Sequence, residues 1–133
     1  MAAKDHLSPE QLQDHVKYHM ERWDEQYDTP RCADGNCFHA SSGYFDTVRD
    51  HGHAGKLQAY EVPEERRWNG HPFHFALHVE TSKGTYAVDL THRQFDAKAP
   101  YPLIEPVAKF ESRKTMKPYK RIDYDHENDE DED

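Results

Sequence analysis

The chain has 133 residues, the length of one globular domain. It is hydrophilic, with 35% apolar residues, 32% charged residues and a mean hydropathy of -1.18, and no window approaches the roughly 18 apolar residues of a membrane span. The first ten residues, MAAKDHLSPE, lack the apolar stretch of a secretory signal peptide, so we expect a cytoplasmic protein without a membrane partner. Two cysteines do not make a disulfide scaffold.

The net charge of -9 is unevenly distributed along the chain. Residues 123–133 contain eight acidic residues and neither Lys nor Arg, whereas residues 109–122 contain six basic residues and one acid. So acidic a segment cannot bury enough apolar surface to fold. We therefore expect one domain over residues 1–108, a basic segment over 109–122 and a disordered acidic tail over 123–133.

A first helix is predicted from about Pro9 to Tyr27. Ser8 is a good N-cap, Pro9 suits the first helical position, and Gln11 completes a capping box with Ser8. One apolar stripe at helical spacing follows, made of Leu12, Val16, Met20, Trp23 and Tyr27. We expect this helix to pack on the core and to carry no chemistry.

A second helix is predicted from about Cys37 to Asp50, after a loop that ends in Gly35-Asn36. Gly52 suits the left-handed position that follows a helix. A weak strand is expected from Lys56 to Val62. The second helix therefore begins at a cysteine.

The clearest strand signal is a hairpin. Residues 73–80 and 85–90 both alternate apolar and polar side chains, and Lys83-Gly84 between them reads as a two-residue turn. Residues 91–106 contain three prolines and should wrap irregularly, and residues 107–110 read as an edge strand. These elements predict an α+β fold in which N-terminal helices pack on a small antiparallel sheet.

Cys37 is the candidate nucleophile. A thiol attacks as the thiolate, and the N-terminus of a helix favours negative charge, which lowers a thiol pKa. The first backbone N–H groups of a helix have no partner within it and can stabilise an oxyanion. Gly35 would permit the tight turn that exposes the sulfur.

A nucleophilic cysteine needs a base, and the base needs a group that orients it. If Lys83-Gly84 forms the turn, paired residue numbers sum to 167, and His78 lies opposite Asp89 with Cβ atoms about 5 Å apart. His74 points to the same face but would pair with Arg93, further from Asp89. We favour His78 as the base, and His74 stays open because a one-residue bulge would change the register.

Three sequence segments resemble the small papain-like proteins, in particular transglutaminase-like proteins and papain-fold toxin domains. They are Gly35–Phe38, Phe75–Glu80 and Tyr86–Phe95, and the Asp-x-Thr-x-x-Gln-Phe run in the last is the most specific. The resemblance covers about residues 31–106. It implies a papain-like fold in which the cysteine opens a helix on an antiparallel sheet and His and Asp lie on adjacent strands.

The resemblance also implies thiol chemistry on an amide or acyl group of a protein or peptide substrate. Cys37 would be the nucleophile, His78 the general base and acid, and Asp89 the residue that orients the histidine. Peptide or isopeptide cleavage, glutamine deamidation and acyl transfer all share one thioester intermediate, so the sequence does not separate them. The alternative is a non-catalytic papain-like domain that binds a protein partner.

Two other functions are weaker predictions. Cys32, Cys37, His39, His51 and His53 offer zinc ligands, but their spacing matches no usual zinc motif, and we expect no metal and no cofactor. The basic segment carries aromatic residues among its cations, yet the overall charge opposes nucleic-acid binding. His71, His92 and most of the other histidines are expected on the surface, and Gln94 and Phe95 are expected to pack and hydrogen-bond their loop.

Overall fold

A computed structural model of the chain describes residues 6–23, 26–27, 29, 36–67 and 72–123. Its centre is a five-stranded antiparallel sheet with the strand order β4-β3-β2-β1-β5. The strands are β1 (Gly55–Glu61), β2 (Phe73–Thr81), β3 (Gly84–Asp89), β4 (Leu103–Pro106) and β5 (Lys120–Ile122). Tight turns and longer connections place strands that are distant in sequence, such as β1 and β5, side by side.

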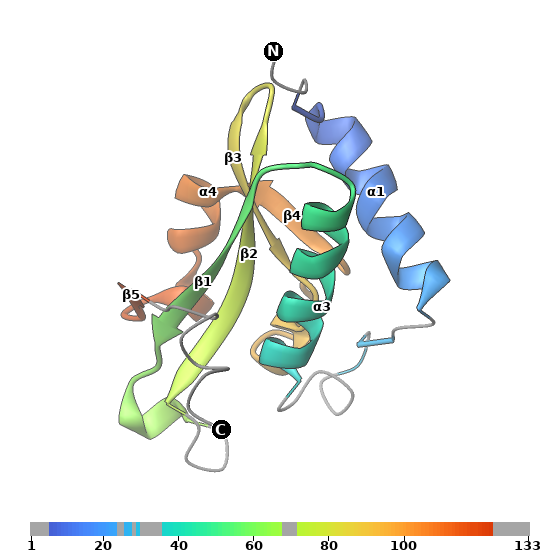
Figure 1. The fold of residues 1–133 in the computed structure, drawn as a ribbon. Coiled ribbons are helices and arrows are strands. Elements are labelled where there is room, and N and C mark those ends of the chain that lie inside the picture. The colour runs from blue at the N-terminus through green and yellow to red at the C-terminus, as the bar shows by residue number, and fades with distance from the viewer. Residues whose placement is uncertain (1–5, 24–25, 28, 30–35, 68–71, 124–133) are drawn as a thin grey trace, which may run out of the picture.

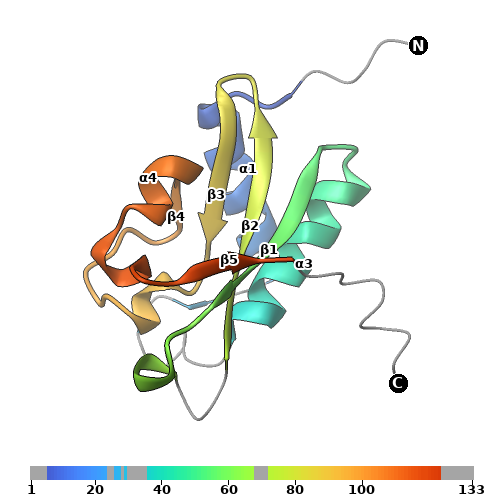
Figure 2. The same cartoon turned by 90° about the vertical axis from the view of Figure 1, so that its left-hand side faces the viewer.

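Two helices lie on one side of this sheet and one short helix lies on the other (Figures 1 and 2). The pair consists of α1 (Pro9–Arg22) and α3 (Cys37–Asp50), and the short helix is α4 (Val107–Glu111). The predicted α+β arrangement of helices on a small antiparallel sheet is therefore confirmed. No helix in the described ranges has the length and apolar character that a membrane crossing requires.

Helix α1 begins as its capping residues predict. The backbone N–H of Gln11 donates to Ser8 Oγ at 3.1 Å, and the backbone N–H of Ser8 donates to Gln11 Oε1 at 2.8 Å. The helix ends at Arg22, earlier than predicted. Tyr27 still enters the core, because its backbone N–H donates to the hydroxyl of Tyr101.

The β2 strand divides its side chains between the two faces of the sheet. Phe75, Leu77 and Val79 pack with the apolar residues of α1 and α3 in the larger core cluster. Ala76 belongs to the smaller cluster on the α4 side, and His74 shares that face because side chains alternate along a strand. The two hydrophobic clusters bury β2 almost completely, so any polar group on it needs a partner.

The predicted hairpin forms, but its turn is displaced. The turn residues are Ser82 and Lys83, and Gly84 follows with φ of +107° as the first residue of β3. The Thr81 hydroxyl accepts from the Lys83 N–H at 3.1 Å and donates to the Gly84 carbonyl at 2.7 Å, which closes the turn there. Paired residue numbers therefore sum to 165, as in the pair of Thr81 and Gly84, and the predicted sum of 167 is wrong.

The C-terminal part of the chain departs from the prediction. Residues 107–110 form α4 and not an edge strand, since Pro106 has no N–H with which to continue β4. The region 91–106, expected to be irregular, contains β4 and a short 3₁₀ turn at His92–Gln94. Residues of the basic segment form β5 on β1, so the sheet extends beyond residue 108. Residues 124–133 of the predicted acidic tail lie outside the described part.

The side chain of Phe110 anchors the C-terminal segment to the sheet. It is fully buried in the α4-side cluster, with ring centroids 5.9 Å from Tyr60 and 5.7 Å from His92. We expect Phe110→Ala to lower the free energy of unfolding by about 3–5 kcal/mol, because it leaves a cavity in a packed cluster. Urea denaturation followed by circular dichroism measures this loss. The exposed neighbour Lys109 is the control, since Lys109→Ala should change stability by less than about 0.5 kcal/mol.

Candidate functional site

The site lies where β2 and β3 separate. Their pairing ends at Leu77 and Val88, while β2 continues back to Phe73 beside β1. The N-terminal turns of α3 reach this part of β2: the Ser41 hydroxyl donates to the carbonyl of Phe75 at 3.0 Å. Because β2 has no β3 partner before Leu77, the N-terminal part of α3 can reach the backbone and side chains at the start of β2.

Cys37 is the first residue of α3, as predicted, and its side chain is partly buried against β2. The sulfur lies 3.9 Å from the carbonyl oxygen of Phe73 and lines the same cavity as the imidazole of His74. Burial raises the pKa of this thiol, but the hydrogen bond and charge of His74 and a backbone hydrogen bond from Phe75 outweigh it, so the net pKa is lowered. The helix N-terminus favours the thiolate as well.

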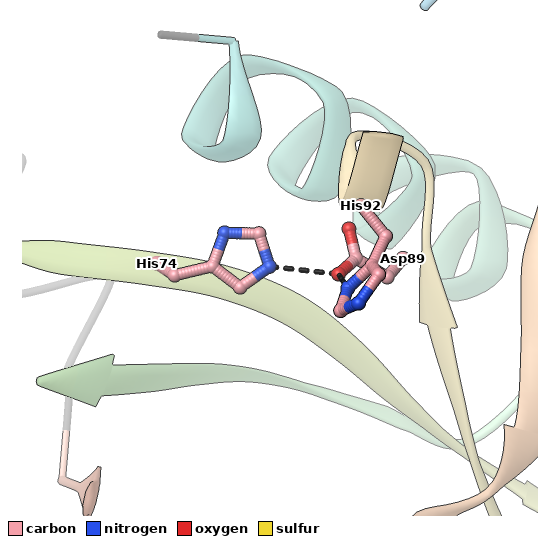
Figure 3. A group of neighbouring side chains, drawn as sticks. All are labelled: His74, Asp89 and His92. Carbon is pink, nitrogen blue, oxygen red and sulfur yellow. Dashed lines mark hydrogen bonds and ion pairs between the residues drawn. The ribbon is translucent and has the colours of Figure 1, made fainter. Parts of the chain in front are cut away.

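His74 points its imidazole toward the carboxylate of Asp89 (Figure 3). Its ring is fully buried, and Nε2 lies 2.7 Å from Asp89 Oδ2. Burial alone would lower the pKa of His74, but the charge and hydrogen bond of Asp89, with the contact to Cys37, raise it to about 10. Burial would likewise raise the pKa of Asp89, yet the charge and hydrogen bond of His74 hold it well below its usual range. The lowered pKa of Cys37, the raised pKa of His74 and the lowered pKa of Asp89 favour a Cys37 thiolate and a His74 imidazolium beside the Asp89 carboxylate at neutral pH.

The predicted position of His78 is wrong. In the observed register His78 lies opposite Ala87, so it does not face Asp89. Its Nε2 lies 2.8 Å from the hydroxyl of Tyr60, which donates to Glu111. Burial, together with the positive charge of Arg121, lowers the pKa of His78 to about 4 and leaves the ring neutral. The structure therefore brings His74, and not His78, to Cys37 and Asp89.

Two further residues hold the Asp89 carboxylate, and sequence analysis missed both roles. His92 Nδ1 lies 2.9 Å from Asp89 Oδ2, and the backbone N–H of Thr91 donates to Asp89 Oδ1 at 3.0 Å. His92 was expected on the surface but is 1% exposed. Its position three residues after a buried acid, at the start of a short turn, is the signal that could have identified it. His71 lies outside the described residues.

A small cavity opens beside the sulfur. Its volume is about 180 Å³, and Cys37, His74, Arg66 and Gln94 contribute its polar atoms. The remaining walls are apolar, formed by Phe38, Val62, Pro72, Phe73, Phe75 and Phe95. Gln94 Nε2 donates to the Thr91 hydroxyl at 3.2 Å, and Phe95 packs edge-to-face on His74 at 4.8 Å between centroids. Both residues therefore pack and hydrogen-bond as predicted, and the cavity is large enough for a single side chain.

One group of side chains in the described ranges has the composition of a metal site. The ligand atoms of His74, Asp89 and His92 lie within 4.8 Å of one another. Two nitrogens lie only 2.7 and 2.9 Å from the same oxygen, whereas ligands on a tetrahedral zinc with 2.0–2.1 Å bonds lie about 3.3 Å apart. The distances of 2.7 and 2.9 Å are those of hydrogen bonds. His74, Asp89 and His92 are therefore spaced for hydrogen bonding to one another and not for binding a metal ion.

The zinc ligands considered from sequence do not converge in the described part of the chain. Cys37 begins α3, whereas His51 follows its last residue and pairs with His15 at 2.8 Å. A helix of 14 residues separates its ends by about 20 Å. His39 is exposed, and Cys32 lies outside the described residues.

Comparison with protein-family models, with curated proteins and with solved structures found no match to this chain. The chemistry of the side chains themselves is then the guide to function. A thiol at a helix N-terminus, an imidazole on the same cavity and a buried carboxylate hydrogen-bonded to that imidazole are the three parts that an activated nucleophile requires. A reaction at the Cys37 sulfur is the chemistry that this arrangement favours.

Proposed function

We propose that the protein is a papain-like cysteine hydrolase or acyltransferase that acts on an amide through a thioester intermediate. The observation that supports this most directly is that Cys37 and His74 line one cavity, with Nε2 of His74 held at 2.7 Å by Asp89. The order Cys, His, Asp along the chain, with the cysteine opening a helix on an antiparallel sheet, supports a papain-like fold. Thiolate chemistry also suits a reducing compartment such as the cytoplasm.

In the proposed reaction the Cys37 thiolate attacks the carbonyl carbon of the amide. The carbon–oxygen π electrons move to the oxygen, and the N–H groups at the start of α3 stabilise the resulting oxyanion. When this intermediate collapses, the carbon–nitrogen bond breaks, the imidazolium of His74 donates its proton to the departing nitrogen, and a thioester to Cys37 remains.

His74 is then neutral and acts as a base in the second half of the reaction. It removes a proton from water, or from an acceptor amine, as that nucleophile attacks the thioester carbonyl. The carbon–sulfur bond breaks, and the thiolate–imidazolium pair re-forms. Asp89 stays ionised throughout and stabilises the imidazolium.

The cavity at the sulfur favours a protein or peptide substrate that presents one side chain beside the reacting amide. Its volume of about 180 Å³ is smaller than a typical small-molecule site of about 300–1,000 Å³. Water as the second nucleophile gives peptide cleavage or glutamine deamidation, and an amine gives acyl transfer. Intact mass of a candidate target separates them, since deamidation adds about 1 Da and cleavage gives two fragments.

We expect Cys37 to remain reactive toward iodoacetamide at pH 6, where an ordinary thiol reacts slowly. A thiol with a pKa near 8.5 loses about tenfold in thiolate for each pH unit below that value. The lowered pKa of Cys37 should give it a larger thiolate fraction at pH 6 than an ordinary thiol has. Peptide mapping by mass spectrometry after timed alkylation between pH 5 and pH 9 measures both cysteines separately.

Cys32 in the same chain is the internal reference for this measurement. The proposal requires Cys37 to be alkylated at least about tenfold faster than Cys32 at pH 6. Addition of EDTA should leave the rate unchanged. Equal and slow labelling of the two cysteines would instead favour a non-catalytic papain-like domain that binds a protein partner.

A further inference from the structure

We propose that His92 and Thr115 are positioning residues that hold Asp89 against His74, a role that rests on the proposed function. His92 Nδ1 lies 2.9 Å from the same Asp89 oxygen that His74 Nε2 contacts at 2.7 Å. On its far side, His92 Nε2 lies 2.7 Å from the hydroxyl of Thr115. A continuous row of hydrogen bonds thus runs from Thr115 to the imidazole beside Cys37.

The protons in this row follow from the charge of Asp89. An ionised carboxylate only accepts hydrogen bonds, so both nitrogens that face Oδ2 carry a hydrogen. A neutral His92 is therefore the tautomer with its proton on Nδ1. Its Nε2 then accepts from the hydroxyl of Thr115, which supports the tautomer that Asp89 selects.

The carboxylate of Asp89 is held at both oxygens. Oδ2 accepts from His74 and His92, and Oδ1 accepts from the backbone N–H of Thr91. Asp89 and His92 are each 1% exposed, so no water competes for these bonds. The carboxylate cannot rotate away from His74 without leaving a buried donor unpaired, which is unfavourable.

The C-terminal segment supplies one end of the row. Thr115 lies in the short 3₁₀ turn Lys114–Met116, which follows α4. The ring of His92 is packed between Phe95 and Phe110, with centroids 5.6 and 5.7 Å away. Residues after position 106 therefore help to orient the imidazole of His74 through His92 and Asp89.

Two variants at position 92 test this role in the full chain. An asparagine places a side-chain N–H at the position of the histidine Nδ1, whereas a phenylalanine keeps the volume of the ring without any donor. We expect His92→Phe to reduce Cys37 alkylation at pH 6 by about tenfold and to move its pH profile to higher pH. His92→Asn should stay within about threefold of the unmodified protein. Thermal unfolding confirms that both variants fold.

Two substitutions at Thr115 test its hydroxyl separately from its volume. Thr115→Ser keeps the hydroxyl, and Thr115→Val removes it at similar volume. We expect the valine variant to weaken alkylation at pH 6 and the serine variant to preserve it. A folded His92→Phe variant with an unchanged pH profile would overturn the proposal, as would equal effects of valine and serine at position 115.

Nitrogen-15 NMR of the histidine rings provides a readout that does not depend on activity. The expected result is a His92 ring with its proton on Nδ1 and an unprotonated Nε2. A ring protonated on Nε2 alone would overturn the proposal even if Cys37 is reactive. An unreactive Cys37 in a protein with the expected His92 tautomer would instead reject the proposed enzymatic function.

Discussion

His74→Ala should reduce Cys37 alkylation at pH 6 on the order of 100-fold, because the thiol loses the hydrogen bond and the positive charge that lower its pKa. Hydrolysis or transfer at an amide should be lost as well, since no other imidazole in the described part contacts this sulfur. Timed alkylation followed by peptide mapping measures the first effect.

His78→Ala is the matched control on the same strand. His78 contacts Tyr60 and not the sulfur, so its removal should leave Cys37 alkylation within about threefold. The variant should still lose stability, on the order of 1–3 kcal/mol, because a buried hydrogen bond to Tyr60 is broken. A reactive Cys37 in His74→Ala, with loss of reactivity in His78→Ala, would reject the site described above.

Asp89→Asn should also strongly reduce amide turnover and the reactivity of Cys37. The amide has nearly the shape of the carboxylate but no charge, so the largest opposition to the burial of His74 is removed and the pKa of His74 falls. The thiolate–imidazolium pair is then lost at neutral pH, and amide turnover should fall on the order of 100- to 1,000-fold. The pH profile of Cys37 alkylation should move to higher pH.

The charges of Asp89 and His74 should also make the free energy of unfolding depend on pH. The pKa of Asp89 is lowered by folding, so its contribution is present above about pH 4 and is lost as the pH falls through the acid range. The pKa of His74 is raised, so its contribution is present below about pH 6.5 and is lost as the pH rises toward 10. Urea denaturation from pH 3 to pH 10 should therefore show the gap between the unmodified protein and Asp89→Asn narrowing at both ends.

Glu105 is a buried carboxylate away from the sulfur and serves as the control for this variant. It accepts a hydrogen bond from Arg113 at 2.8 Å and is 5% exposed. We expect Glu105→Gln to lower stability without moving the pH profile of Cys37 alkylation. If both variants move the profile equally, the effect of Asp89 is a general loss of structure and not a property of the site.

Local patterns in the sequence predicted the elements that position the nucleophile. The capping box at Ser8 and the helix over residues 37–50 depend on short-range hydrogen bonds and on helical spacing, which neighbouring residues carry by themselves. The alternation along residues 73–80 likewise predicted which side chains share a face. Cys37 at a helix start and Asp89 at a strand end were therefore placed correctly in their elements and named as candidate site residues without tertiary information.

The predicted pairing of His78 with Asp89 depended on the position of one turn. A side-chain hydrogen bond from Thr81 moved the hairpin by one position, which changed the sum of paired residue numbers by two. If the observed register were continued, Asp89 would lie opposite Ala76, with His74 and His78 as its two diagonal neighbours. Register alone could not distinguish them, because both project from the same face of β2.

The sequence by itself thus determined the two long helices, the faces of β2 and the position of the thiol at a helix start, since these depend on residues a few places apart. Only the tertiary structure decided which imidazole meets the thiol, because the separation of β2 from β3 admits α3 beside His74 and leaves His78 under Tyr60. The same is true of His92 and Thr115, which lie 23 residues apart. Long-range contacts of this kind follow from the packing of whole elements, and no local pattern encodes them.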